Sequence, residues 1–145
     1  MRVFWRGKPI DMPQEDLEAV LILDRDPLAR RMASSILRAQ KYSVLEAWEW
    51  KSASAMVRRN DVRLVLLDFR IERASHCRLA ARMKKSQPGL EVILTYQPED
   101  NDAAGRYTGS AGTLCLPKPF TLVELCRTVR SALDGRARSA LSSVA

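Results

Sequence analysis

Two aspartates and a lysine have the clearest potential for chemistry in this sequence. Asp24 directly follows the apolar run 20–23, Asp68 directly follows the apolar run 64–67, and Lys118 stands before a proline. Carboxylates that lie near one another bind hard, oxygen-loving cations, and a lysine supplies a positive point charge for oxygen-rich anions. The three residues matter only if the fold brings them together.

Short apolar runs alternate with amphipathic segments along most of the chain. The apolar runs predict buried strands over 20–23, 43–45, 64–67, 92–95 and 113–116. The intervening patterns predict helices over about 27–40, around 53–57, over 75–86 and over 100–108. A capping box at 121–124 predicts a last helix that ends at about Leu133. Five strand–helix units predict an α/β fold with a doubly wound parallel sheet.

Ligands of such sheets bind beyond the carboxyl ends of the strands. The predicted strand ends are therefore the informative positions, and they carry Asp24, Arg25, Asp26, Asp68, Thr95, Tyr96 and Lys118.

Composition excludes several classes of protein. The 145 residues, 46% of them hydrophobic, suit one compact domain. No apolar run approaches the ~20 residues of a membrane span, and the N-terminus lacks the pattern of a signal peptide. The three cysteines, Cys77, Cys115 and Cys126, are odd in number and widely spaced, which favours thiols in a reducing compartment. We therefore expect a soluble, cytoplasmic protein without a membrane partner.

The net charge of +7 raises the alternative of a nucleic-acid-binding protein. The basic residues are scattered, however, mostly over the polar faces of predicted helices. A solvated surface is therefore favoured over a nucleic-acid interface.

Taken together, the residues at the strand ends resemble those of the receiver domain of bacterial two-component response regulators. The resemblance covers about residues 19–133 and is carried by Leu-Pro-Lys-Pro-Phe at 116–120, Leu-Asp-x-Asp-Pro at 23–27 and Val-Leu-Leu-Asp at 65–68. It implies a flavodoxin-like (βα)5 fold with strand order 2-1-3-4-5. We expect a receiver-like domain over 19–134, an N-terminal extension over 1–18 that either packs on it or stays disordered, and a tail over 135–145 without an output domain.

The resemblance also implies a role for each strand-end residue. Asp68 would be the phosphoacceptor, which takes a phosphoryl group from the phosphohistidine of a sensor histidine kinase or phosphotransfer protein. Asp24 and Asp68 would hold magnesium, and Asp26 is a candidate substitute ligand. Lys118 would pair with the phosphoryl group, and the Lys118–Pro119 bond is typically cis in the family.

The sequence departs from the family pattern at the second acid after the first strand, which is Arg25 here. A cation beside a divalent ion weakens its binding, so magnesium is expected to bind weakly or not at all. One hypothesis is that the Arg25 guanidinium forks onto Asp24 or Asp68 and replaces the metal. The protein would then be a phosphorylation-independent pseudo-receiver, and Arg25→Asp should restore magnesium binding.

Three further positions depart from the pattern. Ile71-Glu72 stands where Met-Pro often follows the phosphoacceptor, and Cys115 stands at the aromatic switch position. The hydroxyl that reports phosphorylation is Thr95 by chemistry or Tyr96 by spacing, and the sequence leaves both open.

The favoured interpretation is a stand-alone, non-enzymatic signalling receiver that acts on a downstream protein target. The family usually signals through the face built from its helix four, strand five and helix five, which would include Arg127 and Arg130. The pseudo-receiver adaptor is the first alternative and the nucleic-acid-binding protein the second. A homodimer, the cognate kinase and the pathway are left open.

Overall fold

Five parallel strands form the central sheet of the computed structural model, which describes residues 3–10, 17–75, 78–111 and 113–142. The strands are β3 (Ala19–Leu23), β4 (Ser43–Ala47), β5 (Leu64–Asp68), β6 (Glu91–Tyr96) and β7 (Leu114–Pro117). Their order across the sheet is β4-β3-β5-β6-β7. Counted along the chain, this is the order 2-1-3-4-5, which confirms the predicted doubly wound fold.

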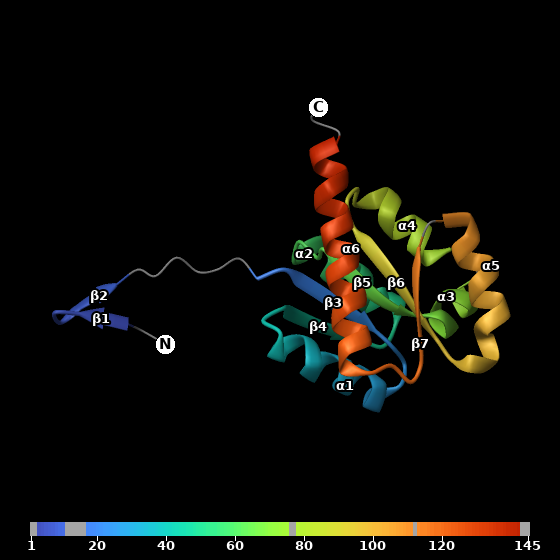
Figure 1. The fold of residues 1–145 in the computed structure, drawn as a ribbon, viewed down its shortest axis with the longest axis horizontal. Coiled ribbons are helices and arrows are strands. Elements are labelled where there is room, and N and C mark those ends of the chain that lie inside the picture. Colours follow the sequence, from blue (N-terminus) through green and yellow to red (C-terminus); the bar gives the residue numbers. More distant parts are fainter. Residues whose placement is uncertain (1–2, 11–16, 76–77, 112, 143–145) are drawn as a thin grey trace.

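Helices cover both faces of the sheet (Figure 1). They are α1 (Pro27–Ala39), α2 (Trp50–Arg59), α3 (Phe69–Ser75), α4 (Leu79–Ser86), the 3-10 turn η1 (Pro98–Asp100), α5 (Asn101–Ala111) and α6 (Leu122–Ser142). Helices α1 and α6 pack on one face, and α2 to α5 pack on the other. None of the helices within the described ranges is both long and apolar enough to cross a bilayer.

The apolar runs become central strands because both of their faces are buried. Side chains alternate across a strand, so Val20 and Ile22 pack under α1 and α6, whereas Leu21 and Leu23 join the opposite cluster. These four side chains are at most 1% exposed. The sheet is thus packed against a hydrophobic core on both of its faces.

The predicted helix over 75–86 is wrong in part. A separate helix, α3, begins directly after Asp68, and α4 begins only at Leu79. Arg78, just before α4, has the left-handed φ of 49°, which a regular helix cannot contain. No glycine or proline marks this break, so the sequence pattern gave no sign of it. Cys77, placed on this helix by the pattern, lies outside the described residues.

The last helix begins as predicted but ends later. The Thr121 hydroxyl accepts a hydrogen bond from the Glu124 N–H at 3.1 Å, as a capping residue does. Helix α6 then continues past Leu133 and through Gly135 to Ser142. One interior glycine costs a helix only about 0.5–1 kcal/mol relative to alanine, so it does not force an end.

An antiparallel hairpin precedes the domain. It consists of β1 (Val3–Trp5) and β2 (Lys8–Ile10), joined at Arg6 and Gly7, whose φ angles are 53° and 76°. Two consecutive positive φ angles are typical of the tight turns that connect hairpin strands. In Figure 1 the hairpin lies apart from the five-stranded sheet.

Candidate functional site

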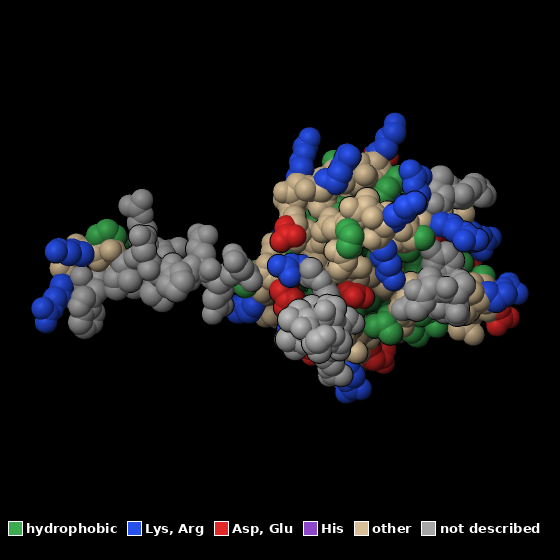
Figure 2. Space-filling model, turned by 90° about the horizontal axis from the view of Figure 1, so that it is seen from above, with side chains coloured by type: hydrophobic (Ala, Val, Ile, Leu, Met, Phe, Trp, Pro, Cys, Tyr) green, Lys and Arg blue, Asp and Glu red, His purple; other side chains and the backbone are tan. Residues whose placement is uncertain are grey.

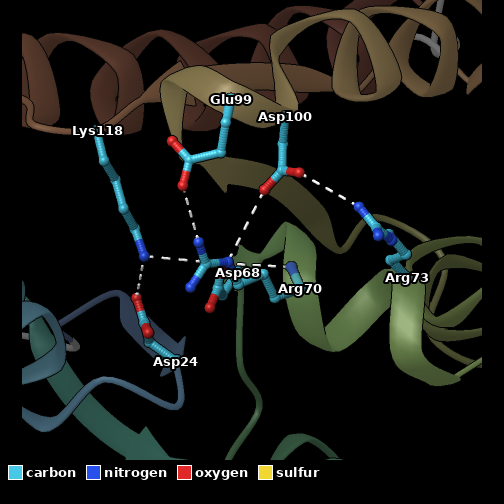
Figure 3. A network of polar contacts seen from close by, with 7 residues as sticks. All are labelled: Asp24, Asp68, Arg70, Arg73, Glu99, Asp100 and Lys118. Carbon is cyan, nitrogen blue, oxygen red and sulfur yellow. Dashed lines mark hydrogen bonds and ion pairs between the residues drawn. The ribbon is translucent and has the colours of Figure 1, made fainter.

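An acidic pocket with one lysine lies at the carboxyl ends of β3, β5 and β7 (Figure 3). Lys118 Nζ lies 2.7 Å from Asp24 Oδ2 and 3.7 Å from Asp68 Oδ1. The three side chains are only 9%, 7% and 5% exposed, in the order Lys118, Asp24 and Asp68. The structure therefore brings together the three residues that the sequence singled out, and buries them as one charged group.

Backbone contacts fix the first carboxylate. The Asp24 N–H donates to the Ala47 carbonyl of the neighbouring strand at 3.1 Å, and its Oδ1 accepts from the Asp26 N–H at 2.9 Å. Arg30 Nη1 donates to the Asp24 carbonyl at 2.7 Å. Hydrogen bonds thus fix the backbone and the Oδ1 atom of Asp24, and its Oδ2 atom contacts Lys118.

The lysine is aimed into the pocket from β7. Its backbone N–H donates to the Tyr96 carbonyl at 2.8 Å, which ties the end of β7 to β6. The Lys118–Pro119 bond is cis, as the resemblance implied.

Asp68 lies in an environment that disfavours its charge. Burial, and then the nearby Asp24 carboxylate, raise the pKa of Asp68 above its ordinary value, whereas Lys118, the Arg70 N–H and the Arg70 charge lower it. The Arg70 N–H lies 3.4 Å from Asp68 Oδ1. Lys118 and Arg70 thus offset only part of the effect of burial and of Asp24 on the pKa of Asp68.

The structure distinguishes the two candidate hydroxyls after strand β6. Thr95 is the direct register partner of Asp68 across β5 and β6, and it is 2% exposed. Strand alternation places Thr95 and Asp68 on the face that also carries Leu66 and Ile93. Tyr96 instead packs half-buried against the opposite cluster. Thr95 is therefore the hydroxyl-bearing residue on the pocket side.

The donor set for a metal consists of two carboxylates, those of Asp24 and Asp68. The Asp26 carboxylate is exposed and accepts from the Leu28 N–H at 3.0 Å, so it caps α1 rather than turning into the pocket. Across the described part of the chain, no three Asp, Glu, His or Cys side chains form a metal-ligating cluster. Magnesium commonly takes one or two carboxylates and keeps its remaining ligands as water, so the pair fits this ion.

Arg25 does not fill the pocket, which corrects the metal-mimic hypothesis. Its side chain is exposed, and within the described ranges it forms no ion pair with Asp24 or Asp68. Lys118 reaches both carboxylates instead. The physical reason is that Arg25 lies in the turn between β3 and the capped start of α1, where its long side chain extends into solvent.

An ion-pair network beside the pocket was missed by the sequence analysis (Figure 3). Arg70 Nη2 lies 3.1 Å from Glu99 Oε1, and Arg70 Nε lies 3.8 Å from Asp100 Oδ2. Arg73 Nη1 lies 3.3 Å from Asp100 Oδ1. The network links α3 to η1 across 29 positions of sequence, so no local spacing indicates it.

The other departures from the family pattern have structural roles of their own. Glu72 is 4% exposed, and its Oε2 accepts from the Ala80 N–H at 3.2 Å, in the first turn of α4. Cys115, at the aromatic switch position, packs half-buried against the cluster beneath α2 to α5. A buried carboxylate therefore stabilises the start of α4 where the sequence showed only the loss of a Met-Pro pair.

The two arginines expected on the signalling face lie on α6. Arg127 and Arg130 line a hollow of about 450 Å³ with Gln40 and Tyr42, on the α1 side of α6. Arg130 Nη2 pairs with Glu18 at 2.9 Å, and its guanidinium lies 5.8 Å from the centre of the Tyr42 ring. The Arg130 side chain thus turns toward the residues that precede β3 and β4.

A second hollow opens beside the acidic pocket. Its volume is about 270 Å³, and its lining includes Lys118, Pro119, Phe120 and the α1 residues Leu28 and Met32. Leu28 and Met32 are 75% and 55% exposed. The rim of the pocket is therefore largely apolar, although Asp26 and Gln97 also line the hollow, whereas the floor of the pocket is charged.

Comparison with known proteins identifies the family that the sequence resembles. The response regulator receiver domain family matches residues 20–130. The probable transcriptional regulatory protein TcrX of Mycobacterium tuberculosis is 28% identical over 116 residues, which cover 79% of this chain and 49% of that protein. The transcriptional regulatory protein GlrR of Escherichia coli is 31% identical over 115 residues, which cover 79% of this chain and 26% of that protein. The chain thus spans half or less of the length of these relatives.

Solved structures share the fold. A CheY-like response regulator receiver domain protein from Methanospirillum hungatei has a TM-score of 0.73 and 21% identity, and the match covers 86% of this chain and 99% of that one. NtrX from Brucella abortus in complex with ADP has a TM-score of 0.80 and 22% identity, over 88% of this chain and 29% of that one. The family match covers most of the chain, and the fold agrees with it. The chain therefore belongs to the response regulator receiver domain family, the non-enzymatic signalling modules of two-component systems.

Proposed function

We propose that Asp68 accepts a phosphoryl group and that the protein signals through the resulting change in its surface. The observation that carries this proposal is the single buried group of Asp24, Asp68 and Lys118 at one edge of the sheet. A carboxylate nucleophile, a second carboxylate and a fixed ammonium are the charges that phosphoryl transfer to an aspartate needs.

Phosphoryl transfer to Asp68 exchanges one bond of the phosphorus atom for another. The P–N bond of a phosphohistidine breaks as a P–O bond forms to a carboxylate oxygen of Asp68, and the imidazole nitrogen keeps the electron pair and takes a proton from solvent. Lys118 provides positive charge beside the phosphoryl oxygens and is already aimed at Asp68. Asp24 and Asp68 would hold magnesium, which when bound neutralises negative charge on the phosphoryl group.

The apolar rim supports a helical phosphodonor as the partner. Leu28 and Met32 are four residues apart on α1, so they form one exposed apolar strip beside Lys118 and Phe120. An amphipathic helix that carries a phosphohistidine could pack on this strip and present the phosphate to the pocket. This is the chemistry of a sensor histidine kinase or phosphotransfer protein, and the output would be binding of a downstream protein.

A small phosphodonor tests the proposal directly. The protein is incubated with magnesium and acetyl phosphate, and intact mass is compared with that of the Asp68→Asn variant. We expect the mass gain of one phosphoryl group in the wild type and none in the variant. A folded wild type that gains no phosphoryl group, or a variant that gains it equally, would contradict the assignment of Asp68.

Arg25 favours a second candidate, a phosphorylation-independent adaptor. A cation stands where the family has an acid, and its charge opposes magnesium even from an exposed position. Arg25→Asp should tighten magnesium binding about tenfold or more. A unit charge pair at ~4 Å is worth roughly 1 kcal/mol even in water, and the substitution changes the charge by two units beside a divalent ion. Tryptophan fluorescence during a magnesium titration measures the effect.

A charge-matched variant separates a local effect from a general one. Arg31→Asp makes the same charge change at an exposed position farther along α1 and should tighten magnesium binding much less. If Arg25→Asp also restores phosphorylation that the wild type lacks, the natural protein is an adaptor. If the wild type is phosphorylated already, Arg25 only tunes the metal affinity and the adaptor candidate is wrong.

The distribution of charge does not favour a nucleic-acid interface. Figure 2 shows Lys and Arg side chains spread over the visible face, with Asp and Glu side chains among them. Several cations are also paired with acids, for example Arg30 and Arg38 with Glu46.

A further inference from the structure

The network beside the pocket connects the proposed phosphoacceptor to η1 and the start of α5. Arg70 is two residues after Asp68, and its N–H and its charge both act on that carboxylate. Its guanidinium extends away to Glu99 and Asp100 at 3.1 and 3.8 Å. One side chain therefore joins the pocket to an element that begins 29 residues later in the sequence.

These ion pairs are of the kind that a stronger anion displaces. The side chains of Arg70 and Glu99 are 55% and 65% exposed, whereas that of Asp100 is 12% exposed, so water and salt weaken the Arg70–Glu99 attraction most. A phosphoryl group carries nearly two negative charges and three strong acceptor oxygens, and guanidinium binds such groups through two parallel hydrogen bonds. Phosphorylation at Asp68 would place this anion close to the Arg70 backbone.

We propose that Arg70 is a phosphoryl-binding residue, and that its transfer from Glu99 and Asp100 to the phosphoryl group on Asp68 releases η1 and the start of α5. The proposal rests on the proposed function of Asp68. It also gives this chain a route from the pocket to α5 that needs no aromatic side chain at position 115, where Cys115 stands.

Arg73 provides a built-in comparison. It lies on the same helix and pairs with the same Asp100 at 3.3 Å, but no contact joins it to Asp68 within the described residues. Removal of Arg73 should loosen η1 slightly and leave the response to phosphorylation intact. Removal of Arg70 should abolish the response.

Amide hydrogen exchange over residues 98–106, with and without acetyl phosphate and magnesium, tests the proposal in the full chain. In the wild type we expect phosphorylation to speed exchange there about two- to fivefold, the size expected when exposed ion pairs are lost. Arg70→Gln should show the faster exchange without phosphate and no further change with it. Arg73→Gln should respond as the wild type does.

Intact mass, measured on the same samples, separates the two proposals. A mass gain without faster exchange at 98–106, or a full response in Arg70→Gln, would overturn the role of Arg70 while Asp68 remains the phosphoacceptor. Absence of any Asp68-dependent mass gain would overturn both. The double variant Glu99→Gln with Asp100→Asn is a second check that does not depend on phosphorylation. Its amides at 98–106 should exchange fast without phosphate. Exchange at the wild-type rate would refute the idea that the ion pairs of Arg70 hold η1 and the start of α5.

Discussion

Lys118 Nζ donates to Asp24 Oδ2 at 2.7 Å, although the two residues are 94 positions apart in the sequence. The same ammonium lies 3.7 Å from Asp68 Oδ1, so one cation serves two buried carboxylates. Two carboxylates and one ammonium leave one net negative charge in the pocket, and a divalent cation would offset it. This relationship makes the pocket sensitive to the loss of any one of its members.

Replacement of Lys118 by Met should destabilise the fold. The variant leaves two buried carboxylates without their shared cation, which typically costs about 3–5 kcal/mol. The pKa of Asp68 should also rise further because Lys118 no longer lowers it. Urea denaturation at pH 7 measures the loss, and the loss should shrink toward pH 4 as the carboxyls take up protons.

Arg127→Met provides the control for this experiment. Arg127 is exposed, so its replacement should change the free energy of unfolding by no more than about 0.5 kcal/mol. A loss as small as this in Lys118→Met would mean that the ammonium does not stabilise the pocket.

Asp68 should make the stability of the protein depend on pH. Because its folded pKa is raised above the ordinary value of 3.8, the folded state holds the proton more tightly than the unfolded chain does. The stabilisation is fully present below the unfolded pKa and is lost as pH rises through the folded pKa. The free energy of unfolding of the wild type, minus that of Asp68→Asn, should therefore fall as pH rises above about 4 in paired urea titrations. A difference that grows with pH would mean that the folded pKa is lowered instead.

Thr95 and Tyr96 should differ in their effect on signalling. Thr95→Val removes the hydroxyl of the residue that pairs with Asp68 across β5 and β6, and it nearly keeps the shape of the side chain. The chain should therefore still accept beryllium fluoride, a phosphoryl mimic, but show smaller amide NMR shifts in β7 and α5. Tyr96→Phe removes a hydroxyl on the opposite face and should leave these shifts unchanged. The reverse pattern would mean that the hydroxyl of Tyr96, and not that of Thr95, responds to the phosphoryl group.

Glu72 should contribute to stability through the start of α4. Glu72→Ala removes the acceptor of the Ala80 N–H and should cost about 1–3 kcal/mol, whereas Glu72→Gln keeps an acceptor oxygen and should cost less. Thermal or urea denaturation measures both. Glu49→Ala is the comparison, because Glu49 holds the N-cap position of α2 without a capping side-chain bond and should matter little. Equal losses for Glu72→Ala and Glu72→Gln would show that the charge, and not the capping bond, is what counts.

The fold was predictable because its signals are local and repeated. Runs such as 20–23 and 64–67 are continuously apolar, which is the pattern of strands buried on both faces, and the structure confirms them as β3 and β5. Their order along the chain, with helices between them, leaves few topologies that obey right-handed crossovers. The break between α3 and α4 was not predictable, because Arg78 adopts its left-handed backbone without a glycine or proline to signal it.

The sequence by itself determined that Asp24, Asp68 and Lys118 would lie at one edge of the sheet, because each stands at the end of a strand or directly after it and parallel strands end at one edge. Only the tertiary structure decided which charged side chains contact one another. It placed Lys118 rather than Arg25 against the carboxylates, and Thr95 rather than Tyr96 beside Asp68. The physical reason is that side-chain direction depends on strand register and on the course of each turn, and contacts between distant elements leave no trace in local spacing.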